Sequence, residues 1–258
     1  MASTTGASAW ERESVTRGPG LGAAFALAAV YVGISVGGTL ALDLAVPSLR
    51  DRNRDLVVEA LLAVYVALVV VLASWRAEVG LTRLSRWRRP MLAVVPLAFT
   101  LVPLAGGLRT AQDSLAVLLV GYALNSVAED GMVAGILPNV LRGRGLPSVI
   151  LIAPLLFAIA HFGNLASRPD QSLAIAAAQA LGVFTQGIGF VLIRITVNSI
   201  VPVMVVHFLA DLFLQLGGGP IVAASMVEST LFLLYGVWLY RRYKPELVTL
   251  GWPSRRVG

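Results

Sequence analysis

The feature that most constrains this chain is a succession of apolar runs, each close to 20 residues long, separated by short polar segments. About 20 apolar residues in a helix span the hydrocarbon core of a bilayer. In lipid, a spanning segment has to satisfy its backbone hydrogen bonds internally, as an α-helix does. Only 13% of the residues are charged, against about 25% in a typical soluble domain. The sequence therefore predicts an all-α integral membrane protein, a bundle of about eight transmembrane helices. The expected spans are 21–46, 56–75, 91–106, 113–138, 148–165, 171–193, 199–216 and 220–240.

The two ends of the chain differ from its apolar middle. Residues 1–20 are polar and contain Gly, Ser and Thr, which indicates a disordered cytoplasmic tail. Residues 21–243 form the expected membrane-embedded bundle, and residues 244–258 the expected cytoplasmic C-terminal tail. The first apolar run is longer than the roughly 7–15-residue core of a signal peptide, so we expect it to be a span.

The basic residues predict how the bundle is oriented. If the N-terminus is cytoplasmic, fifteen of the 20 Lys and Arg residues flank the cytoplasmic ends of the spans. Because positive residues gather on that side of a membrane, both termini are expected in the cytoplasm. The high content of Ala, Val and Arg favours a bacterial plasma membrane. The basic residues form no stripe interleaved with aromatic residues, so we expect membrane lipids as partners and no nucleic acid.

An acidic pair, Glu129-Asp130, interrupts the fourth apolar run. An Asp or Glu at the centre of a spanning helix costs roughly 2.5–3.5 kcal/mol, and two ionised neighbours also repel each other. Intramembrane acidic residues usually mark a functional site. The natural partners are His161 and His207, the only two histidines in the chain, since each also lies in an apolar run.

The rise of an α-helix places these residues in one layer. At about 1.5 Å per residue, Glu129, His161, His207 and Asp211 all lie about 14–21 Å from the cytoplasmic ends of their spans. Residues four apart share a helical face. His207 therefore shares a face with Asp211, Asn125 shares one with Glu129, and Phe157 shares one with His161.

A layer of this composition is suited to hydrolysis. A carboxylate can take a proton from water as the oxygen attacks an acyl carbon, and a neighbouring histidine can orient that water. A second histidine with an acid or amide can stabilise the oxyanion in a dry pocket. Two imidazoles with carboxylates are also plausible zinc ligands, although the spacing differs from that of His-Glu-x-x-His enzymes. The chain has no cysteine, which excludes thiol catalysis.

Structural roles are the alternative for each of these groups. The acidic pair and the His207–Asp211 pair could belong to a polar network that fixes helix packing. Gln179 and Gln186, seven residues apart on one face, are interpreted as packing residues. Glu59, near the start of the second span, is expected at the membrane interface. Gly131 and Gly135 would allow close helix approach or leave space for a substrate.

Three short motifs on successive spans, covering about residues 113–216, resemble those of a family of intramembrane proteases. This is the CPBP family, which includes the CAAX prenyl proteases and the bacteriocin-processing Abi proteins. Its first motif, Glu-Glu-x-x-x-Arg, is similar to Glu129-Asp130-Gly-Met-Val-Ala134. Its second motif, Phe-x-x-x-His, matches Phe157-Ala-Ile-Ala-His161. Its third motif, His-x-x-x-Asn or Asp, matches His207-Phe-Leu-Ala-Asp211.

The resemblance implies a role for each catalytic residue. Glu129 would activate water with His161 beside it, while His207 and Asp211 would stabilise the oxyanion. Asp130, Asn125 and Phe157 would support these groups. Whether the chemistry uses zinc or the glutamate alone stays open, and the substrate implied is a prenylated C-terminus, a bacteriocin leader or a peptide signal.

Two residues depart from the first motif. Asp130 replaces the second Glu and is one methylene shorter, and Ala134 replaces the Arg that would neutralise the acidic pair. The nearest substitutes in the sequence are Arg142 and Arg144. The sequence thus predicts an intramembrane endopeptidase that cleaves a peptide or membrane-protein substrate. Its alternatives are a catalytically inactive relative that acts as a membrane scaffold or immunity protein, and a transporter with an intramembrane proton or cation site.

Overall fold

The computed structural model describes residues 20–82, 88–110, 113–167 and 171–249. The secondary structure of these segments is helical, apart from one isolated β-bridge between Leu108 and Gly217. Within them, six helices are long and apolar enough to cross a membrane, and two shorter apolar helices accompany them. The prediction of an all-α membrane bundle is therefore confirmed.

The six long helices follow the apolar runs of the sequence. They are α2 (Leu21–Ala45), α3 (Asp51–Leu72), a helix over Leu115–Arg144, a helix over Leu146–Gly163, α9 (Leu173–Val197) and α11 (Ile221–Thr249). Leu115–Arg144 comprises α5 (Leu115–Asp130), the π-helical η4 (Gly131–Ile136), α6 (Leu137–Leu141) and the 3-10 turn η5 (Arg142–Arg144). Leu146–Gly163 comprises α7 (Leu146–Ala160) and η6 (His161–Gly163), and the short α8 (Asn164–Ser167) follows. The shorter apolar helices are Pro90–Gly106 and α10 (Val201–Leu216).

Two helices differ from the expected spans for identifiable reasons. Residues Pro90–Gly106 form three short pieces, η2 (Pro90–Ala93), α4 (Val94–Phe99) and η3 (Val102–Gly106). Pro96 and Pro103 each lack a backbone N–H, which weakens a continuous helix here. Helix α3 begins earlier than expected, at Asp51, because an acidic side chain in the first turn interacts favourably with the helix dipole.

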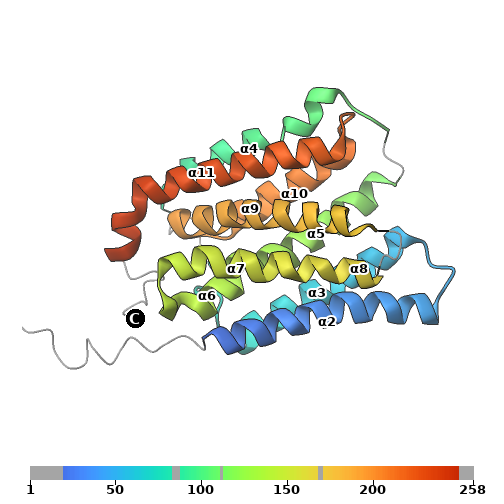
Figure 1. Cartoon of the computed structure of the whole chain (residues 1–258), viewed down its shortest axis with the longest axis horizontal. Coiled ribbons are helices and arrows are strands. Elements are labelled where there is room, and N and C mark those ends of the chain that lie inside the picture. Colours follow the sequence, from blue (N-terminus) through green and yellow to red (C-terminus); the bar gives the residue numbers. More distant parts are fainter. Residues whose placement is uncertain (1–19, 83–87, 111–112, 168–170, 250–258) are drawn as a thin grey trace, which may run out of the picture.

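The long helices lie side by side and both ends of the described chain lie at the same end of the bundle (Figure 1). We call this the terminal end; it holds Leu21, η5 and the C-terminal part of α11. The opposite end, which we call the distal end, holds the connections 46–50 and 217–220 and the start of α9. A backbone hydrogen bond from Gly20 to Val140 joins the start of α2 to α6 at the terminal end.

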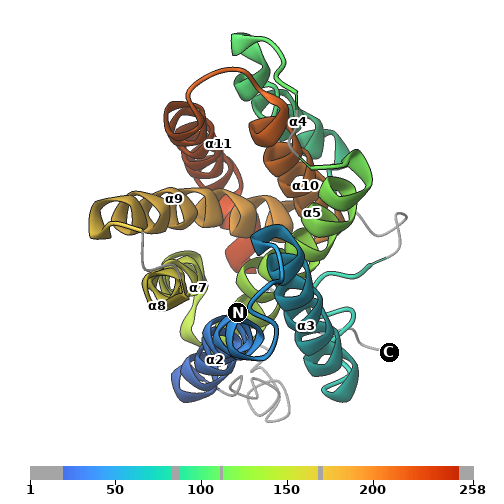
Figure 2. The same cartoon turned by 90° about the vertical axis from the view of Figure 1, so that its right-hand side faces the viewer.

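Helix α9 lies between α7 and α11 in both views of the bundle (Figures 1 and 2). Its C-terminal half, Gly187–Val197, is entirely buried. Gly189 of α9 faces Gly236 of α11, and a Cβ atom on Gly236 would lie 2.9 Å from the Cα of Gly189. Small residues of this kind let two membrane helices approach closely. The second small-residue pair, Gly131 and Gly135, also packs against neighbours, Val66 and Val79.

The chain ends are described only in part. Helix α11 continues through Thr249, so residues 244–249 of the predicted C-terminal tail are helical. Residues 1–19 and 250–258 lie outside the described residues, and the division into two tails and a bundle stays a prediction.

We predict that Gly236→Ala destabilises the bundle by about 1–3 kcal/mol, the usual cost of overpacking. The added methyl group would meet both Gly189 and the Cδ1 atom of Leu192, at 3.3 Å. The measurement is the thermal unfolding midpoint in detergent. Gly37→Ala on α2 is the matched control, because a Cβ there meets nothing within 4 Å. Equal midpoints for the two variants would show that the α9–α11 contact is not tightly packed.

Candidate active site

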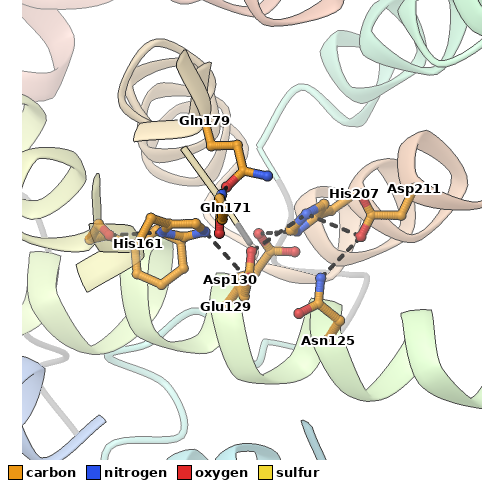
Figure 3. Close-up of polar contacts among 9 residues, drawn as sticks. Asn125, Glu129, Asp130, His161, Gln171, Gln179, His207 and Asp211 are labelled. Atoms are coloured by element: carbon orange, nitrogen blue, oxygen red, sulfur yellow. Dashed lines mark hydrogen bonds and ion pairs between the residues drawn. The ribbon is translucent and has the colours of Figure 1, made fainter. Parts of the chain in front are cut away.

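Three helices bring the polar residues of the apolar runs together (Figure 3). Glu129 and Asp130 end α5, His161 follows α7, and His207 and Asp211 lie on α10. The Glu129 carboxylate lies between the two histidines, with Oε1 3.8 Å from His161 Nε2 and Oε2 3.8 Å from His207 Nε2. Asp211 Oδ2 lies 3.6 Å from the same His207 nitrogen. The four residues proposed from the sequence as catalytic thus lie in one row of contacts, from His161 through Glu129 and His207 to Asp211.

The backbone after the acidic pair changes from α to π geometry. Gly131–Ile136 form the π-helical segment η4, and all six residues are buried. Gly131 lies against Val66 of α3, so the chain approaches that helix closely just beyond Asp130. Single π turns inside α-helices occur frequently at functional sites, and this one follows directly after the two acids.

His161 is oriented by its own helix. Its Nδ1 lies 3.0 Å from the carbonyl oxygen of Phe157, one turn earlier. The Phe157 ring packs edge-on against the imidazole at 4.9 Å and is itself buried against Tyr31. Because Nδ1 is engaged by the carbonyl, Nε2 is the nitrogen that faces Glu129. Phe157 therefore lies on the His161 face, as the spacing predicts.

His207 is oriented by a carboxylate. Its Nδ1 lies 3.1 Å from Asp130 Oδ1, and the Phe190 ring packs beside it at 5.4 Å. Asp130 is completely buried. A carboxylate on one imidazole nitrogen fixes the ring and leaves the other nitrogen available, so Nε2 points toward Glu129 and Asp211. Asn125 completes this side, since its Nδ2 donates to Asp211 Oδ2 at 3.0 Å.

The departures from the first motif have a structural consequence. Ala134 lies fully buried in η4. Arg142 and Arg144 lie beyond α6 in η5, at the terminal end of the bundle. His207 instead contacts Asp130, and the other carboxylate oxygen, Oδ2, has no hydrogen-bond partner among the described residues.

A cavity of about 680 Å³ opens in front of these residues. Helices α5, α7, α9, α10 and α11 line it, with Glu129, His161, His207 and Asp211 on its wall. Gln179 and Gln186, interpreted from the sequence as packing residues, line the cavity as well. Gln179 also accepts a hydrogen bond from Gln171 at 2.6 Å. We call this space the main cavity.

Sequence reasoning missed two further acidic residues. Glu59, expected at the membrane interface, is only 17% exposed and lies 3.8 Å from Arg52. Glu228 of α11 is 3% exposed, and its Oε1 has no hydrogen-bond partner in the described part of the chain. A signal for Glu228 does exist in the sequence, because it is the one acid within the eighth apolar run.

The zinc alternative does not fit the side chains as they lie. Among residues 20–82, 88–110, 113–167 and 171–249, no group of three or more His, Cys, Asp or Glu side chains is arranged to hold a metal ion. We therefore derive no step through a metal.

Comparison with known proteins finds a similarity over the segment that holds this site. Residues 111–213 match the family model described as type II CAAX prenyl endopeptidase Rce1-like. The matched segment contains Glu129, His161, His207 and Asp211. No curated protein matches the chain. Residues 111–213 are thus similar to a family of intramembrane CAAX-type endopeptidases, which confirms the resemblance noted in the three motifs.

We predict that Asp130 and His207 are energetically coupled. Polar contacts between membrane helices contribute about 0.6 kcal/mol on average and about 1.7 kcal/mol at most. The measurement is a double-mutant cycle of Asp130→Ala and His207→Ala on unfolding in detergent, with a coupling energy in that range expected. Asn125→Ala combined with His207→Ala serves as a comparison, since these two residues share only Asp211. Strict additivity of Asp130→Ala and His207→Ala would contradict the contact.

Proposed function

We propose that this protein is an intramembrane endopeptidase in which Glu129 activates water to hydrolyse a peptide bond near the membrane. The observation that carries the proposal is the position of the Glu129 carboxylate. It lies between two histidine nitrogens, at 3.8 Å from each, on the wall of the 680 Å³ cavity. A water on the cavity side, at about 2.8 Å from both atoms, can bridge a carboxylate and an imidazole at this separation.

The first step uses Glu129 and His161. Water bound between them loses a proton to Glu129 as its oxygen attacks the carbonyl carbon of the peptide. His161 holds the water through Nε2, because Nδ1 is engaged by the Phe157 carbonyl. Glu129 then passes the proton to the leaving amine, and the C–N bond breaks. The carboxylate is thus regenerated for the next cycle.

The second step of the proposal concerns His207, which stabilises the oxyanion with the help of Asp211. In this mechanism His207 carries a hydrogen on each nitrogen, so that Nδ1–H donates to Asp130 and Nε2–H faces the reacting carbonyl. Asp211 accepts a hydrogen bond from the Asn125 amide, and its carboxylate lies 3.6 Å from His207 Nε2, where it favours the protonated imidazole. Donors fixed in advance within a dry site stabilise developing charge strongly.

The cavity lining favours a substrate with an apolar part. Ile175, Leu214, Ile221 and Val222 line it alongside the two glutamines. A peptide or membrane-protein segment next to the bilayer fits such a lining, and so does a prenylated C-terminus of the kind named by the family description. Pairs of prenylated and unprenylated peptides in one assay separate these two substrate classes.

We predict that Glu129→Gln lowers peptide cleavage by about 10²–10⁴-fold, the usual contribution of general base catalysis. The assay uses purified protein in detergent with a quenched-fluorescent peptide library, with and without a chelator. Glu246→Gln is the matched control, because Glu246 lies exposed on α11 beside Arg89. Retained cleavage in Glu129→Gln would exclude this mechanism. If the chelator abolishes cleavage by the wild type, the chemistry depends on a metal. If a folded wild type cleaves no peptide, the result favours the inactive scaffold, the alternative that Ala134 raises.

We also propose that both termini lie in the cytoplasm of a bacterial plasma membrane. Thirteen basic residues lie in the described part of the chain, and nine of them lie at the terminal end of the bundle, the excess that the positive-inside rule expects on a cytoplasmic side. The other four, Arg50, Arg52, Arg54 and Arg109, lie at the distal end. The nine are Arg76, Arg88, Arg89, Arg142, Arg144, Arg194, Arg241, Arg242 and Lys244. The main cavity is lined by the distal parts of α9, α10 and α11. In this orientation it opens toward the outer side of the membrane, and its peptide substrate is reached from there.

We predict that a cysteine in the α2–α3 connection is accessible from outside intact cells. The natural chain has no cysteine, so a single introduced thiol reports its own side of the membrane. Ser48→Cys at the distal end should react with an impermeant maleimide in intact cells. Gly143→Cys in η5 should react only after permeabilisation. The opposite pattern would reverse the orientation and place the cavity mouth in the cytoplasm.

A further inference from the structure

A second, smaller cavity lies on the other side of Glu129. It measures about 150 Å³ and is lined by residues of α2, α3, α5, α7 and η6. Asn125, Glu129 and His161 line both this cavity and the main cavity. The proposed catalytic group is therefore the wall between the two spaces. We call the smaller one the polar cavity.

Its lining is unusually polar for the interior of a membrane bundle. Ser35 and Thr39 lie four residues apart on α2, and Asp55 and Glu59 lie four residues apart on α3. Residues at this spacing share a helical face, so each helix presents a polar stripe to the same space. Polar side chains within spanning helices are costly in lipid and usually face a water-filled space.

The two stripes lead from the distal end toward the catalytic wall. Asp55 lies in the first turns of α3 and Thr39 near the end of α2, both toward the distal end. Tyr31, further along α2, lines the inner part of the cavity, where Glu129 and His161 form its end. The residues that line the polar cavity thus run from the distal turns of α2 and α3 to the carboxylate of Glu129.

A buried carboxylate oxygen at this cavity has no hydrogen-bond partner among the described residues. It is Oε2 of Glu59, which lines the cavity. The neighbouring Arg52 lies outside the lining, and its Nε and Nη2 atoms are also buried without a hydrogen bond in the described part of the chain. The closest approach of these two side chains, 3.8 Å, is too long for a direct hydrogen bond. Buried polar atoms in native proteins nearly always bond to protein or to ordered water. A space of 150 Å³ exceeds the roughly 30 Å³ that one water occupies in the liquid, so water molecules can supply these partners.

We propose that the polar cavity binds water and delivers it to Glu129 separately from the peptide. This inference rests on the proposed function, because hydrolysis consumes one water for each bond cleaved. The water oxygen forms the new C–O bond, one of its hydrogens reaches the leaving amine, and the C–N bond breaks. A peptide that fills the main cavity excludes solvent from that side, whereas the polar cavity still reaches the carboxylate through Asn125 and His161.

The first experiment measures solvent access directly. Ser35→Cys places a single thiol on the polar cavity in a chain without other cysteines. We expect a charged methanethiosulfonate reagent to modify it at least 10-fold faster than Gly37→Cys in native membranes. Gly37 is the matched control, since it lies exposed on the outside of the same helix two residues away. A thiol in lipid stays protonated and unreactive, because charged forms are disfavoured there. Equal, slow modification of both variants would overturn the proposal.

The second experiment tests the role in catalysis. Ser35→Leu adds bulk to the polar cavity without touching the main cavity. We expect kcat to fall about 10-fold or more with KM unchanged, because peptide binding does not use this space. Ser35→Ala keeps the space open and should remain close to wild type. A rise in KM with unchanged kcat, or full activity of Ser35→Leu, would overturn the water route.

The two proposals fail in different ways. Rapid modification of Ser35→Cys with no cleavage of any peptide supports the water site and overturns the peptidase function. Cleavage that depends on Glu129, with Ser35→Cys no more reactive than Gly37→Cys, supports the peptidase and overturns the water site.

Discussion

The site depends on the buried contact between Asp130 and His207. An acid that is completely buried within an apolar bundle requires a partner, and the imidazole of α10 supplies one at 3.1 Å. Such contacts contribute little to stability in a membrane, because polar groups also find partners in the unfolded state there. The larger consequence is geometric. Fixing Nδ1 sets the rotation of the His207 ring, and Nε2 then faces Glu129 and Asp211. One pair of side chains thereby couples the end of α5 to the short helix α10.

The depth of the site residues was predictable, whereas the rotation of the helices was not. Helical rise is fixed, so residue counts alone place Glu129, His161 and His207 in one layer. To predict how a helix is rotated about its own axis, the sequence has to show a contrast between an apolar and a polar face. A helix that faces lipid is apolar all round and shows no such contrast. For that reason nothing in the sequence pattern indicated that Gln179 and Glu59 line cavities. The π turn after Asp130 has no recognised sequence signal either. The all-α bundle itself followed from the length and composition of the apolar runs.

Because Ala134 replaces the Arg of the first motif, His207 is the residue that contacts the buried acid Asp130. In the motif, a cation on the next turn can neutralise the acidic pair, and Ala134 provides none. The contact that Asp130 makes is with His207. In the proposed mechanism the same imidazole also faces the oxyanion, so one ring serves both the buried acid and the reacting carbonyl. The shorter Asp at this position suits that arrangement, because its carboxylate reaches the ring from α5 while Glu129 extends further into the cavity wall.

An intramembrane hydrolase has to combine two reactants that prefer different solvents. The main cavity suits the apolar part of a peptide, since aliphatic side chains of α9, α10 and α11 line it. The polar stripes of α2 and α3 line a second space whose polar side chains suit water. Glu129 belongs to both linings. A general base in that position can receive water from one side and act on a carbonyl from the other. The polar residues of α2 and α3 and the acidic pair are all costly within a membrane. In this proposal both sets serve one purpose, because they keep water at a depth where lipid excludes it.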